Sequence, residues 1–506
     1  MSNLENDEMV TETEVVEEQC SEGVVASEGF FERKFQLRKK GTNLKTEVMA
    51  GLTTFMAMVY ILMVNAGMFA DPFSSGVNVL GVSYGAMYIV SALSAIIGTV
   101  LIGVLSGLPL AQAPGMGLNA FFVYTMCIGF GFTYANALVF ILLDGLVFVL
   151  LTVTGLRKKI FGAIPDTIKK AIPAGIGLFI AFLGLQNAGL VVADSSTGVT
   201  MGSMNLLADH SWASLVPLFV AILGVIAIGA MSKKNIKGAI LFGILGSAVL
   251  YYALLGLGFA FGDASSKAVF EGIKMTNPFD AFKEFGSQTF GKVFTEGFNF
   301  SAYIDANGIP DFVLMVITSA LAFCLVDMFD TLGTLYGACK SGNLLDENGE
   351  VPNLNNAMMA DAVATCAGAV LGTSTVTTFV ESSAGTAAGG KTALTSYVVA
   401  ILFAVAMFLS PIAQLIPSCA TATALIYVGV LMMNNVRDIE WSDPAVALPA
   451  FLTVAMMPFT YNISFGIGFG LLSYVVIKLC TGKAKEVSVA TYVLAIIFLA
   501  MFLLTH

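Results

Sequence analysis

The stretch "GTSTVTTFVESSAGTAAGG", residues 372–390, decides how this chain folds. It lies in an apolar part of the sequence, yet Thr373 to Val380 is rich in Thr and Val, which favour an extended backbone. Small residues follow from Ser382 onward. We therefore predict a short strand that leads directly into a half-helix.

A second stretch, "GLPLAQAPGMGLNAFF", residues 107–122, has the same character in the first half of the chain. Pro109 and Pro114 bracket a segment that is too short and too broken for a helix, and small residues follow from Gly115. Extended backbone at membrane depth is tolerated only where protein or a cavity covers it. We expect the two strands to pair at mid-membrane, with both half-helices presenting their positive N-terminal ends to one central cavity.

The composition of the whole chain is that of a polytopic membrane protein. Of 506 residues, 57% are hydrophobic and only 11% are charged, whereas soluble domains carry about 25% charged residues. The net charge of −10 comes mostly from residues 1–28, which hold nine acidic residues and no basic one. We interpret residues 1–30 as a disordered acidic cytoplasmic tail. Two histidines and seven scattered cysteines, without a C-x-x-C pair, give no reason to expect a metal site or a cofactor.

Fourteen segments are predicted to form membrane spans, of which the third and tenth are too short to cross alone, since a crossing needs about 20 residues. A further apolar stretch, 487–505, is a fifteenth span or an interfacial helix. The predicted spans are 46–68, 84–106, 116–130, 134–155, 168–192, 212–232, 236–260, 309–337, 355–372, 381–390, 394–416, 419–434, 443–460 and 464–480.

The positions of Lys and Arg fit this map when the N-terminus is cytoplasmic. Such residues concentrate in cytoplasmic loops, and long outer loops are exempt. With this orientation, 20 of the 24 basic residues are cytoplasmic, and the other four lie in the predicted extracellular loop 263–308. We therefore expect a multi-pass protein of the plasma (cell inner) membrane.

The two halves of the chain resemble each other weakly. Asn235-Ile236, followed by four matching residues, has the same spacing as Asn462-Ile463 and its successors, although chance similarity between apolar helices is an alternative. Because seven spans per half is an odd number, the second half enters from the opposite side, as in many secondary transporters. The fold class is thus predicted to be an all-α membrane protein with a 7+7 inverted repeat, 42–262 and 309–480.

The segment Gly385–Thr392 reads G-x-x-x-x-G-K-T, the spelling of a phosphate-binding P-loop. A working P-loop needs a soluble α/β domain and an acidic magnesium ligand, and no hydrophilic part of the chain is long enough to supply them. We interpret these glycines and alanines as close-packing positions in the second half-helix, and we expect no nucleotide binding.

Carboxylates inside apolar segments are costly, so they are functional candidates by default. They are Asp144, Asp327, Asp330, Asp361 and Glu381. Asp327 and Asp330 share one helix face, while Glu381 stands at the start of the second half-helix. Each has a plainer interpretation, as a helix cap, a structural partner or a coupling group, and for Asp144 and Asp361 packing or strand support is the more natural one.

Two carboxylates and the amide of Asn119 around a cavity suit a neutral heterocycle, because a carboxylate can accept N–H bonds from a planar edge. Burial away from water also favours the protonated form of a carboxyl group, as a proton symporter requires. Thr378 and Ser382, which flank Glu381, complete the predicted substrate-binding set.

At these residues the chain resembles the AzgA-like adenine/guanine/hypoxanthine permeases of the nucleobase–cation symporter-2 and nucleobase–ascorbate transporter group. The motifs that carry the resemblance are "TEVMAGLTTFMAMVYILMVNAG" (46–67), "AQAPGMGLNAFF" (111–122), "DMFDTLGTL" (327–335) and "TSTVTTFVESSAGTAAGGKTALTS" (373–396). Departures from the pattern are Asp144, where the family usually has Glu, the acidic tail and the long outer loop.

The resemblance implies proton-coupled uptake of purine bases by a core domain (46–155 and 309–416) that moves against a gate domain (168–260 and 419–480). It gives Asp327 and Glu381 the substrate carboxylate roles and Asn119 a supporting one. Asp330, together with Asp327, is implied in proton coupling or specificity, and a homodimer would form through the gate domain. No catalytic residue is expected.

Other functions are less compatible with the residues. A permease of the same fold for xanthine, uracil or another planar heterocycle is the main alternative. An anion exchanger should offer a cation or bare helix dipoles at its cavity instead of two carboxylates. A membrane enzyme or ATP-driven pump would need a metal cluster or a nucleotide domain, and a channel would show no saturation.

Overall fold

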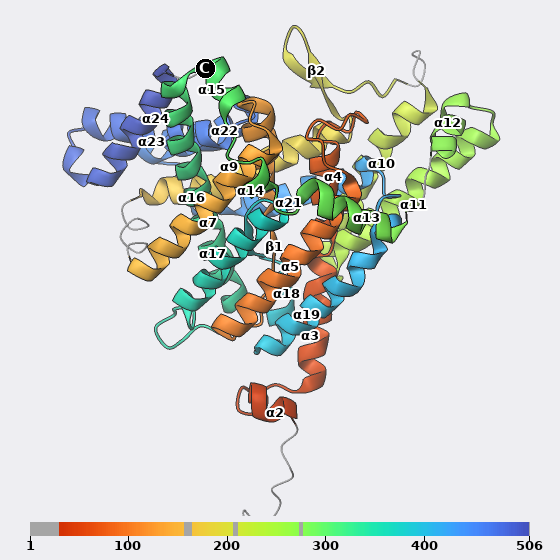
Figure 1. Ribbon diagram of the computed structural model, residues 1–506, viewed down its shortest axis with the longest axis horizontal. Coiled ribbons are helices and arrows are strands. Elements are labelled where there is room, and N and C mark those ends of the chain that lie inside the picture. Colours follow the sequence, from red (N-terminus) through yellow and green to blue (C-terminus); the bar gives the residue numbers. More distant parts are fainter. Residues whose placement is uncertain (1–29, 156–163, 206–210, 273–276, 505–506) are drawn as a thin grey trace, which may run out of the picture.

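The computed structural model describes residues 30–155, 164–205, 211–272, 277–504. The predicted acidic tail, up to residue 29, and the basic residues Arg157, Lys158, Lys159 and Lys274 therefore lie outside the described residues, as do both histidines. The described chain forms a helical body from which the short helix α2 (Phe30–Phe35) and a β-hairpin project at opposite ends (Figure 1).

The first half of the chain follows the predicted order of spans. Its elements are α3 (Leu44–Met58), α4 (Tyr60–Ala70), α5 (Tyr84–Ser106), β1 (Gln112–Pro114), α6 (Met116–Ala120), the π-helix η1 (Phe121–Gly129), α7 (Tyr134–Thr154), α9 (Asp166–Asn187), α10 (Trp212–Lys233) and α11 (Ala239–Ala260). The first predicted span is thus two helices in line, which meet at Val59.

The second half repeats this order. Its elements are α16 (Ile309–Ser341), α17 (Leu354–Leu371), β4 (Val376–Thr378), α18 (Ser382–Ala387), α19 (Ala393–Ala406), η3 (Met407–Leu409), α20 (Ser410–Ala413), α21 (Ser418–Met432), η4 (Met433–Asp438), α22 (Pro444–Thr460) and α23 (Ile463–Cys480). In both halves a strand and a short helix replace the third span. This agreement confirms the predicted fold class.

Local sequence signals fix where the helices begin and end. The Ser83 hydroxyl accepts from the backbone N–H of Ala86 at the start of α5, and Thr133 forms a capping box with Asn136 at the start of α7. Gly107 and Gly155 end the same two helices in the left-handed conformation, which glycine adopts at little cost. Both helices therefore carry the caps that their sequences specify.

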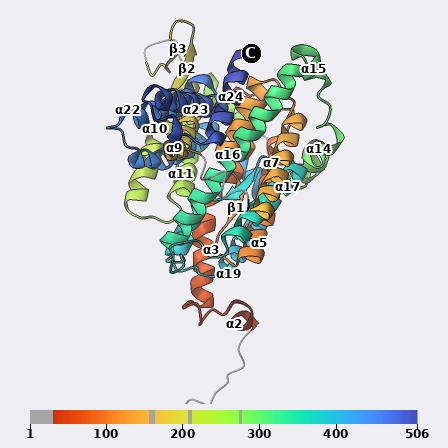
Figure 2. The same cartoon turned by 90° about the vertical axis from the view of Figure 1, so that its left-hand side faces the viewer.

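The two strands pair inside the body, as predicted. β1 and β4 are antiparallel, with Gln112 opposite Thr378 and Pro114 opposite Val376. Helices surround this pair in both views of the ribbon (Figures 1 and 2), and all six strand residues are buried. Each strand's free backbone groups are thus shielded from lipid by protein.

The helices pack in two neighbourhoods. In one, α17 lies against α5 and α7, while α19 lies against α3 and α5. In the other, α9 packs on α21 and α22, and α22 on α23. Gly177 and Gly429 bring α9 and α21 close, because a Cβ on Gly177 would lie 2.9 Å from the Gly429 carbonyl oxygen. The neighbourhoods correspond to the predicted core and gate segments, although their division into moving domains stays a prediction.

Two connecting segments contain secondary structure of their own. β2 (Val191–Asp194) and β3 (Gly198–Met201) form the projecting hairpin. The predicted loop 263–308 contains α12 (Ala264–Gly272), α13 (Pro278–Glu284), η2 (Phe285–Thr289), α14 (Lys292–Thr295) and α15 (Ser301–Asn307). The Asn136 amide donates to the carbonyl oxygens of Gly297 and Asn299, which ties this segment to α7.

The last apolar stretch is a helix, α24 (Val489–Leu504), which follows η5 (Ala484–Glu486). It packs against α23 and α16. The ring of Phe502 lies 4.8 Å from that of Phe469, and Phe498 fills the space beside Gly468. At 16 residues, α24 is shorter than a typical span.

Candidate functional site

The strand pair brings the starts of the two half-helices together. The N–H of Gly115 donates to the carbonyl oxygen of Thr375, and the N–H of Phe379 donates to that of Ala111, so the pairing continues beyond the strands on both sides. Gly115 is the N-cap residue of α6, and Glu381 is the N-cap residue of α18. Both N-terminal ends, with their positive partial charge, therefore lie beside the strand pair. We call this place, where β1 pairs with β4 and where α6 and α18 begin, the strand crossing.

Two carboxylates from different elements meet at this crossing. Glu381 is half-buried, and its Oε1 accepts from the Tyr60 hydroxyl at 2.6 Å. Asp330 of α16 is also half-buried, and its Oδ2 accepts from the Thr377 hydroxyl at 3.5 Å. Thr377 belongs to β4, and Glu381 follows it by four residues. This part of the molecule therefore offers two partly accessible acceptor groups beside the strands.

Asp327 lies one helical turn before Asp330 on α16 and is fully buried. On the preceding turn, the ring of Phe323 lies 4.5 Å from that of Phe121 in η1. Asp330 and Glu381 are thus the partly exposed carboxylates at the crossing, whereas the family resemblance implied Asp327 as the second substrate carboxylate. The role of Asp327 stays a prediction.

The other predicted substrate-binding residues are buried and bonded to the protein. Asn119 accepts through Oδ1 from the Ser374 hydroxyl, which joins the first half-helix to the segment before β4. The Ser382 hydroxyl accepts from the backbone N–H of Ala111 at 3.0 Å. These bonds hold the crossing in shape, and the assignment of the residues to substrate stays a prediction.

Asp361 of α17 supports the strand pair through hydrogen bonds. Its carboxylate accepts from the Thr378 hydroxyl at 2.9 Å, from the Gln112 side-chain amide and from the Thr331 hydroxyl. These three donors come from β4, β1 and α16, so one buried carboxylate links three elements to a fourth. The strand-supporting interpretation of Asp361 therefore has a structural basis.

Asp144 of α7 has a different environment. It is 1% exposed, and among the described residues neither of its carboxylate oxygens has a hydrogen-bond partner. The next residue, Gly145, packs against Cys366 of α17, since a Cβ there would lie 2.6 Å from the Cys366 Sγ. Asp144 therefore sits in the α7–α17 interface and does not join the bonds described at the crossing.

The segment with the P-loop spelling, Gly385–Thr392, binds a carboxylate of the same chain. The backbone N–H groups of Lys391 and Thr392 donate to the fully buried carboxylate of Glu47, at 2.9 and 3.4 Å, and the Thr395 hydroxyl donates to it at 2.6 Å. Glu47 thus occupies the start of α19, where an anion is favoured.

Sequence reasoning missed Tyr60 and Gln112. Tyr60 begins α4, directly after the break in the first span, and Gln112 is the first residue of β1. Gln112 lies in a predicted break of an apolar segment, and this signal could have identified it, whereas the predicted span 46–68 gave no sign of the break before Tyr60. Their partners, Glu381 and Asp361, were among the candidates.

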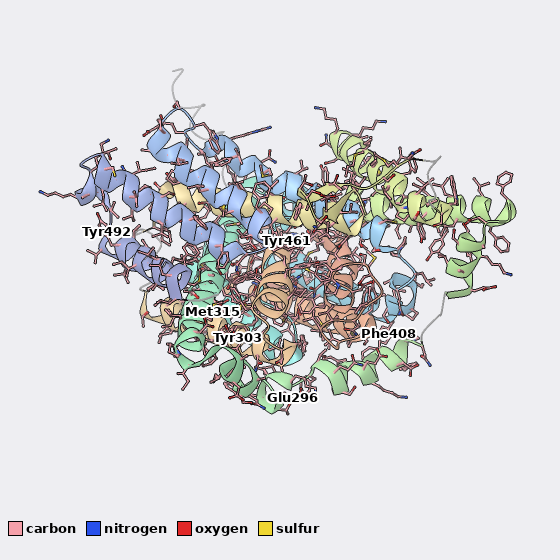
Figure 3. The ribbon with its side chains drawn as sticks, turned by 90° about the horizontal axis from the view of Figure 1, so that it is seen from above. Glu296, Tyr303, Met315, Phe408, Tyr461 and Tyr492 are labelled. Atoms are coloured by element: carbon pink, nitrogen blue, oxygen red, sulfur yellow. The ribbon has the colours of Figure 1, made fainter. Side chains whose placement is uncertain are left out.

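An aromatic cluster joins the two packing neighbourhoods. The ring of Tyr461, between α22 and α23, lies 5.9 Å from Phe179 of α9 and 6.4 Å from Tyr124 of η1. The Thr125 hydroxyl also donates to the Tyr461 carbonyl oxygen at 3.2 Å. Tyr461 lies near the middle of the molecule when it is seen from above (Figure 3).

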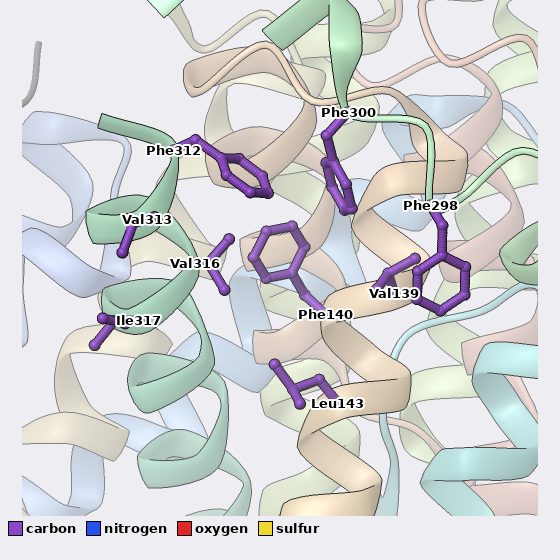
Figure 4. Close-up of a pocket in the computed structure, with 9 residues that line it drawn as sticks. All are labelled: Val139, Phe140, Leu143, Phe298, Phe300, Phe312, Val313, Val316 and Ile317. Carbon is purple, nitrogen blue, oxygen red and sulfur yellow. The ribbon is translucent and has the colours of Figure 1, made fainter. Parts of the chain in front are cut away.

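A separate pocket of about 260 Å³ lies between α7 and α16 (Figure 4). Its lining is apolar throughout and offers nothing that could recognise the N–H groups of a heterocycle. None of the carboxylates at the strand crossing lines it. The lining residues are Val139, Phe140, Leu143, Phe298, Phe300, Phe312, Val313, Val316 and Ile317.

Solved transporter structures share the fold. The transmembrane domain of the cyanobacterial bicarbonate transporter BicA superposes with a TM-score of 0.56 at 16% identity, covering 83% of this chain and 97% of that one. The murine anion transporter Slc26a9 in its inward-facing state gives a TM-score of 0.57 at 11% identity, covering 92% and 75%. At these identities the likeness concerns the fold alone.

Sequence comparison is more specific. Residues 45–469 match the family Xan_ur_permease, described as "Permease family". The guanine/hypoxanthine permease PbuO of Bacillus subtilis is 37% identical over 92% of this chain and 98% of its own length. The adenine permease AdeP of Escherichia coli is 35% identical over 94% and 96%. The chain therefore belongs to this permease family, in the AzgA-like group that its motifs resemble.

Proposed function

We propose that this chain imports purine nucleobases (hypoxanthine, guanine and/or adenine) by proton symport. The observation that carries the proposal is the pair of partly accessible carboxylates, Asp330 and Glu381, beside the starts of two half-helices. The relatives named as guanine/hypoxanthine and adenine permeases, similar over nearly the full chain, support the purine class.

The chemistry of the crossing suits a planar base. A carboxylate accepts two N–H groups from one edge of a heterocycle, and Glu381 is already oriented by the Tyr60 hydroxyl. In the proposed roles, Glu381 and Asp327 bind the base, while Asn119, Thr378 and Ser382 shape its site. Asp330, with Asp327, carries the proton. Because like charges repel strongly where water is scarce, a proton taken up between Asp330 and Glu381 would stabilise the loaded site.

Transport would require the core segments to move against the gate segments. The Tyr461 cluster spans η1, α9 and the α22–α23 corner, so it is one of the contacts that would have to break when the core and gate segments separate there. In this proposal the N-terminus is cytoplasmic, the protein lies in the plasma membrane, and a dimer forms through the gate segments.

The main alternative is a permease of the same fold for xanthine, uracil or another planar heterocycle. The test is uptake of labelled hypoxanthine into cells that lack their own purine permeases, with unlabelled adenine, guanine, xanthine and uracil as competitors. We expect saturable uptake that guanine or adenine blocks, that uracil leaves intact and that a protonophore stops. Uptake blocked by uracil would favour the alternative, and uptake that resists the protonophore would contradict proton symport.

The residue assignment has its own test. Asp327→Asn and Glu381→Gln should each abolish uptake while the variant still reaches the membrane. Normal uptake by either variant would remove that residue from the site.

A further inference from the structure

The start of the described chain carries a dense set of cations. Residues 33–45 include six basic side chains, all exposed, and one acidic side chain, Glu32, directly precedes them. The basic residues are Arg33, Lys34, Arg38, Lys39, Lys40 and Lys45. Among the described residues, no carboxylate forms an ion pair with Arg33, Arg38, Lys39, Lys40 or Lys45.

These cations are displayed on an ordered segment. Leu37 is only 4% exposed, and the ring of Phe35 packs edge-on against Tyr397 of α19 at 5.8 Å. The backbone turns after α2, with the N–H of Lys40 donating to Gln36 and the N–H of Thr42 to Leu37. The backbone N–H of Arg38 also donates to the carboxylate of Glu32 at 2.9 Å. The segment is thus anchored to the body, with its charges pointing outward.

Next to this basic surface, the first turns of α3 expose a stripe of apolar side chains. Leu44, Val48, Met49 and Leu52 are between 36% and 48% exposed. Lys45 stands at the head of the stripe, because residues three, four and seven positions later lie on the same helix face. A cation at the end of a span, followed by apolar side chains along it, matches the order of headgroup and acyl chain in a phospholipid.

We propose that Arg38, Lys39, Lys40 and Lys45, with the α3 stripe, form a binding site for a phospholipid with an anionic headgroup. The headgroup phosphate would lie among the cations, while an acyl chain runs along Val48, Met49 and Leu52. Basic residues next to a span attract anionic lipid by about 1 kcal/mol each. The geometry favours lipid over a free phosphate ion, because the apolar stripe has no role for an ion.

The experiment compares two lipid environments with the full chain in nanodiscs. Hydrogen–deuterium exchange of the backbone amides of residues 38–45 is measured in phosphatidylglycerol and in phosphatidylcholine. We expect exchange to be at least about five-fold slower in phosphatidylglycerol. In the variant Lys39→Gln/Lys40→Gln/Lys45→Gln the two rates should become equal.

The matched control is Lys233→Gln/Lys234→Gln/Lys237→Gln, which removes three other exposed lysines, at the end of α10 and in the turn before α11. It should keep the difference between the two lipids. Equal rates in both lipids for the unaltered chain would overturn the proposal, as would a difference that survives the Lys39/Lys40/Lys45 substitutions. Slowing by glycerol phosphate in phosphatidylcholine discs would assign the site to free phosphate instead. Slow exchange in both lipids that is lost on deleting residues 1–28 would assign this surface to the acidic tail.

Discussion

The two half-helices begin at equivalent places, yet their first residues differ completely. The N-cap of α6 is Gly115, which has no side chain, whereas the N-cap of α18 is Glu381, which points a carboxylate toward Tyr60. A Cβ on Gly115 would lie 2.9 Å from the Thr377 hydroxyl and 3.8 Å from the Asp330 Oδ2.

The difference teaches how an internal repeat can become a binding site. The second half supplies the functional groups, Glu381 from α18 and Asp330 from α16. The first half supplies the space that these groups need, at Gly115. Its own polar residue, Asn119, is fully buried and bonded to Ser374. A two-fold backbone arrangement therefore carries an asymmetric set of side chains.

The largest expected effect on uptake comes from neutralising Glu381, the N-cap residue of α18 in the second half. Glu381→Gln keeps the size of the side chain but removes a charged acceptor, and hydrogen bonds to charged groups are worth about 1.5–3 kcal/mol. We expect kcat/KM for purine uptake to fall by at least about 100-fold, so that uptake no longer rises above that of the host cells, with unchanged amounts of protein in the membrane. Uptake of labelled hypoxanthine measures this fall in kcat/KM.

The control for this change is Glu284→Gln, which removes a carboxylate that accepts from Ser83 outside the crossing. It should leave uptake unchanged. If Asn119→Ala in the first half were as damaging as Glu381→Gln, the asymmetry between the halves would be wrong.

Filling the space in the first half should have the next largest effect. In Gly115→Ala, the new Cβ would crowd the Thr377 hydroxyl, which donates to Asp330. Overpacking of this kind costs about 1–3 kcal/mol. We expect at least about a ten-fold loss of uptake. Gly67→Ala in α4 is the matched control, because a Cβ there meets nothing within 4 Å. Equal uptake by the two variants would show that Gly115 is not needed for its empty space.

The hydrogen bonds that Asp361 accepts from β1, β4 and α16 can be weakened without changing either N-cap residue. Asp361→Asn removes the charge that three donors share, one from each strand and one from α16. We expect the free energy of unfolding to fall by about 2–3 kcal/mol, and thermal unfolding of the purified protein measures the loss. Asp144→Asn is the control, since its carboxylate has no partner among the described residues; it should be neutral or stabilising. A loss as large for Asp144→Asn would contradict the role given to Asp361.

Much of this architecture could be predicted from the sequence, because its signals are local. Thr-Val runs, prolines and small residues mark the strands and half-helices, and their pairing follows from the need to cover bare backbone inside a membrane. The arrangement of side chains could not be predicted in the same way. Asp327 and Asp330 are three residues apart on one helix, and only the packing of α16 leaves one half-buried and the other fully buried.

The same limit explains Tyr60 and Glu47. Each bonds to a residue more than 300 positions away, Tyr60 to Glu381 and Glu47 to Thr395. Periodicity and spacing carry no information about partners at that separation. Sequence reasoning predicted no nucleotide binding at Gly385–Thr392, and it could not foresee that Glu47 is the anion bound at the end of that segment.

The smallest expected effect concerns how Glu381, the N-cap residue of α18, is held in place. Tyr60→Phe removes the one hydroxyl that orients Glu381 in the described contacts but keeps the ring and the carboxylate. A single hydrogen bond of about 1–1.5 kcal/mol should raise KM by about five- to ten-fold, with little change in kcat, because the carboxylate remains able to bind the base. Tyr88→Phe is the matched control: it removes a buried hydroxyl that donates to the carbonyl oxygen of Ala406 at 3.1 Å. A raised KM in the Tyr60 variant alone would mean that the second half's N-cap is held in place by the first half's own helix. If neither variant changed KM, Glu381 would orient itself without help, and the first half would contribute only the space at Gly115.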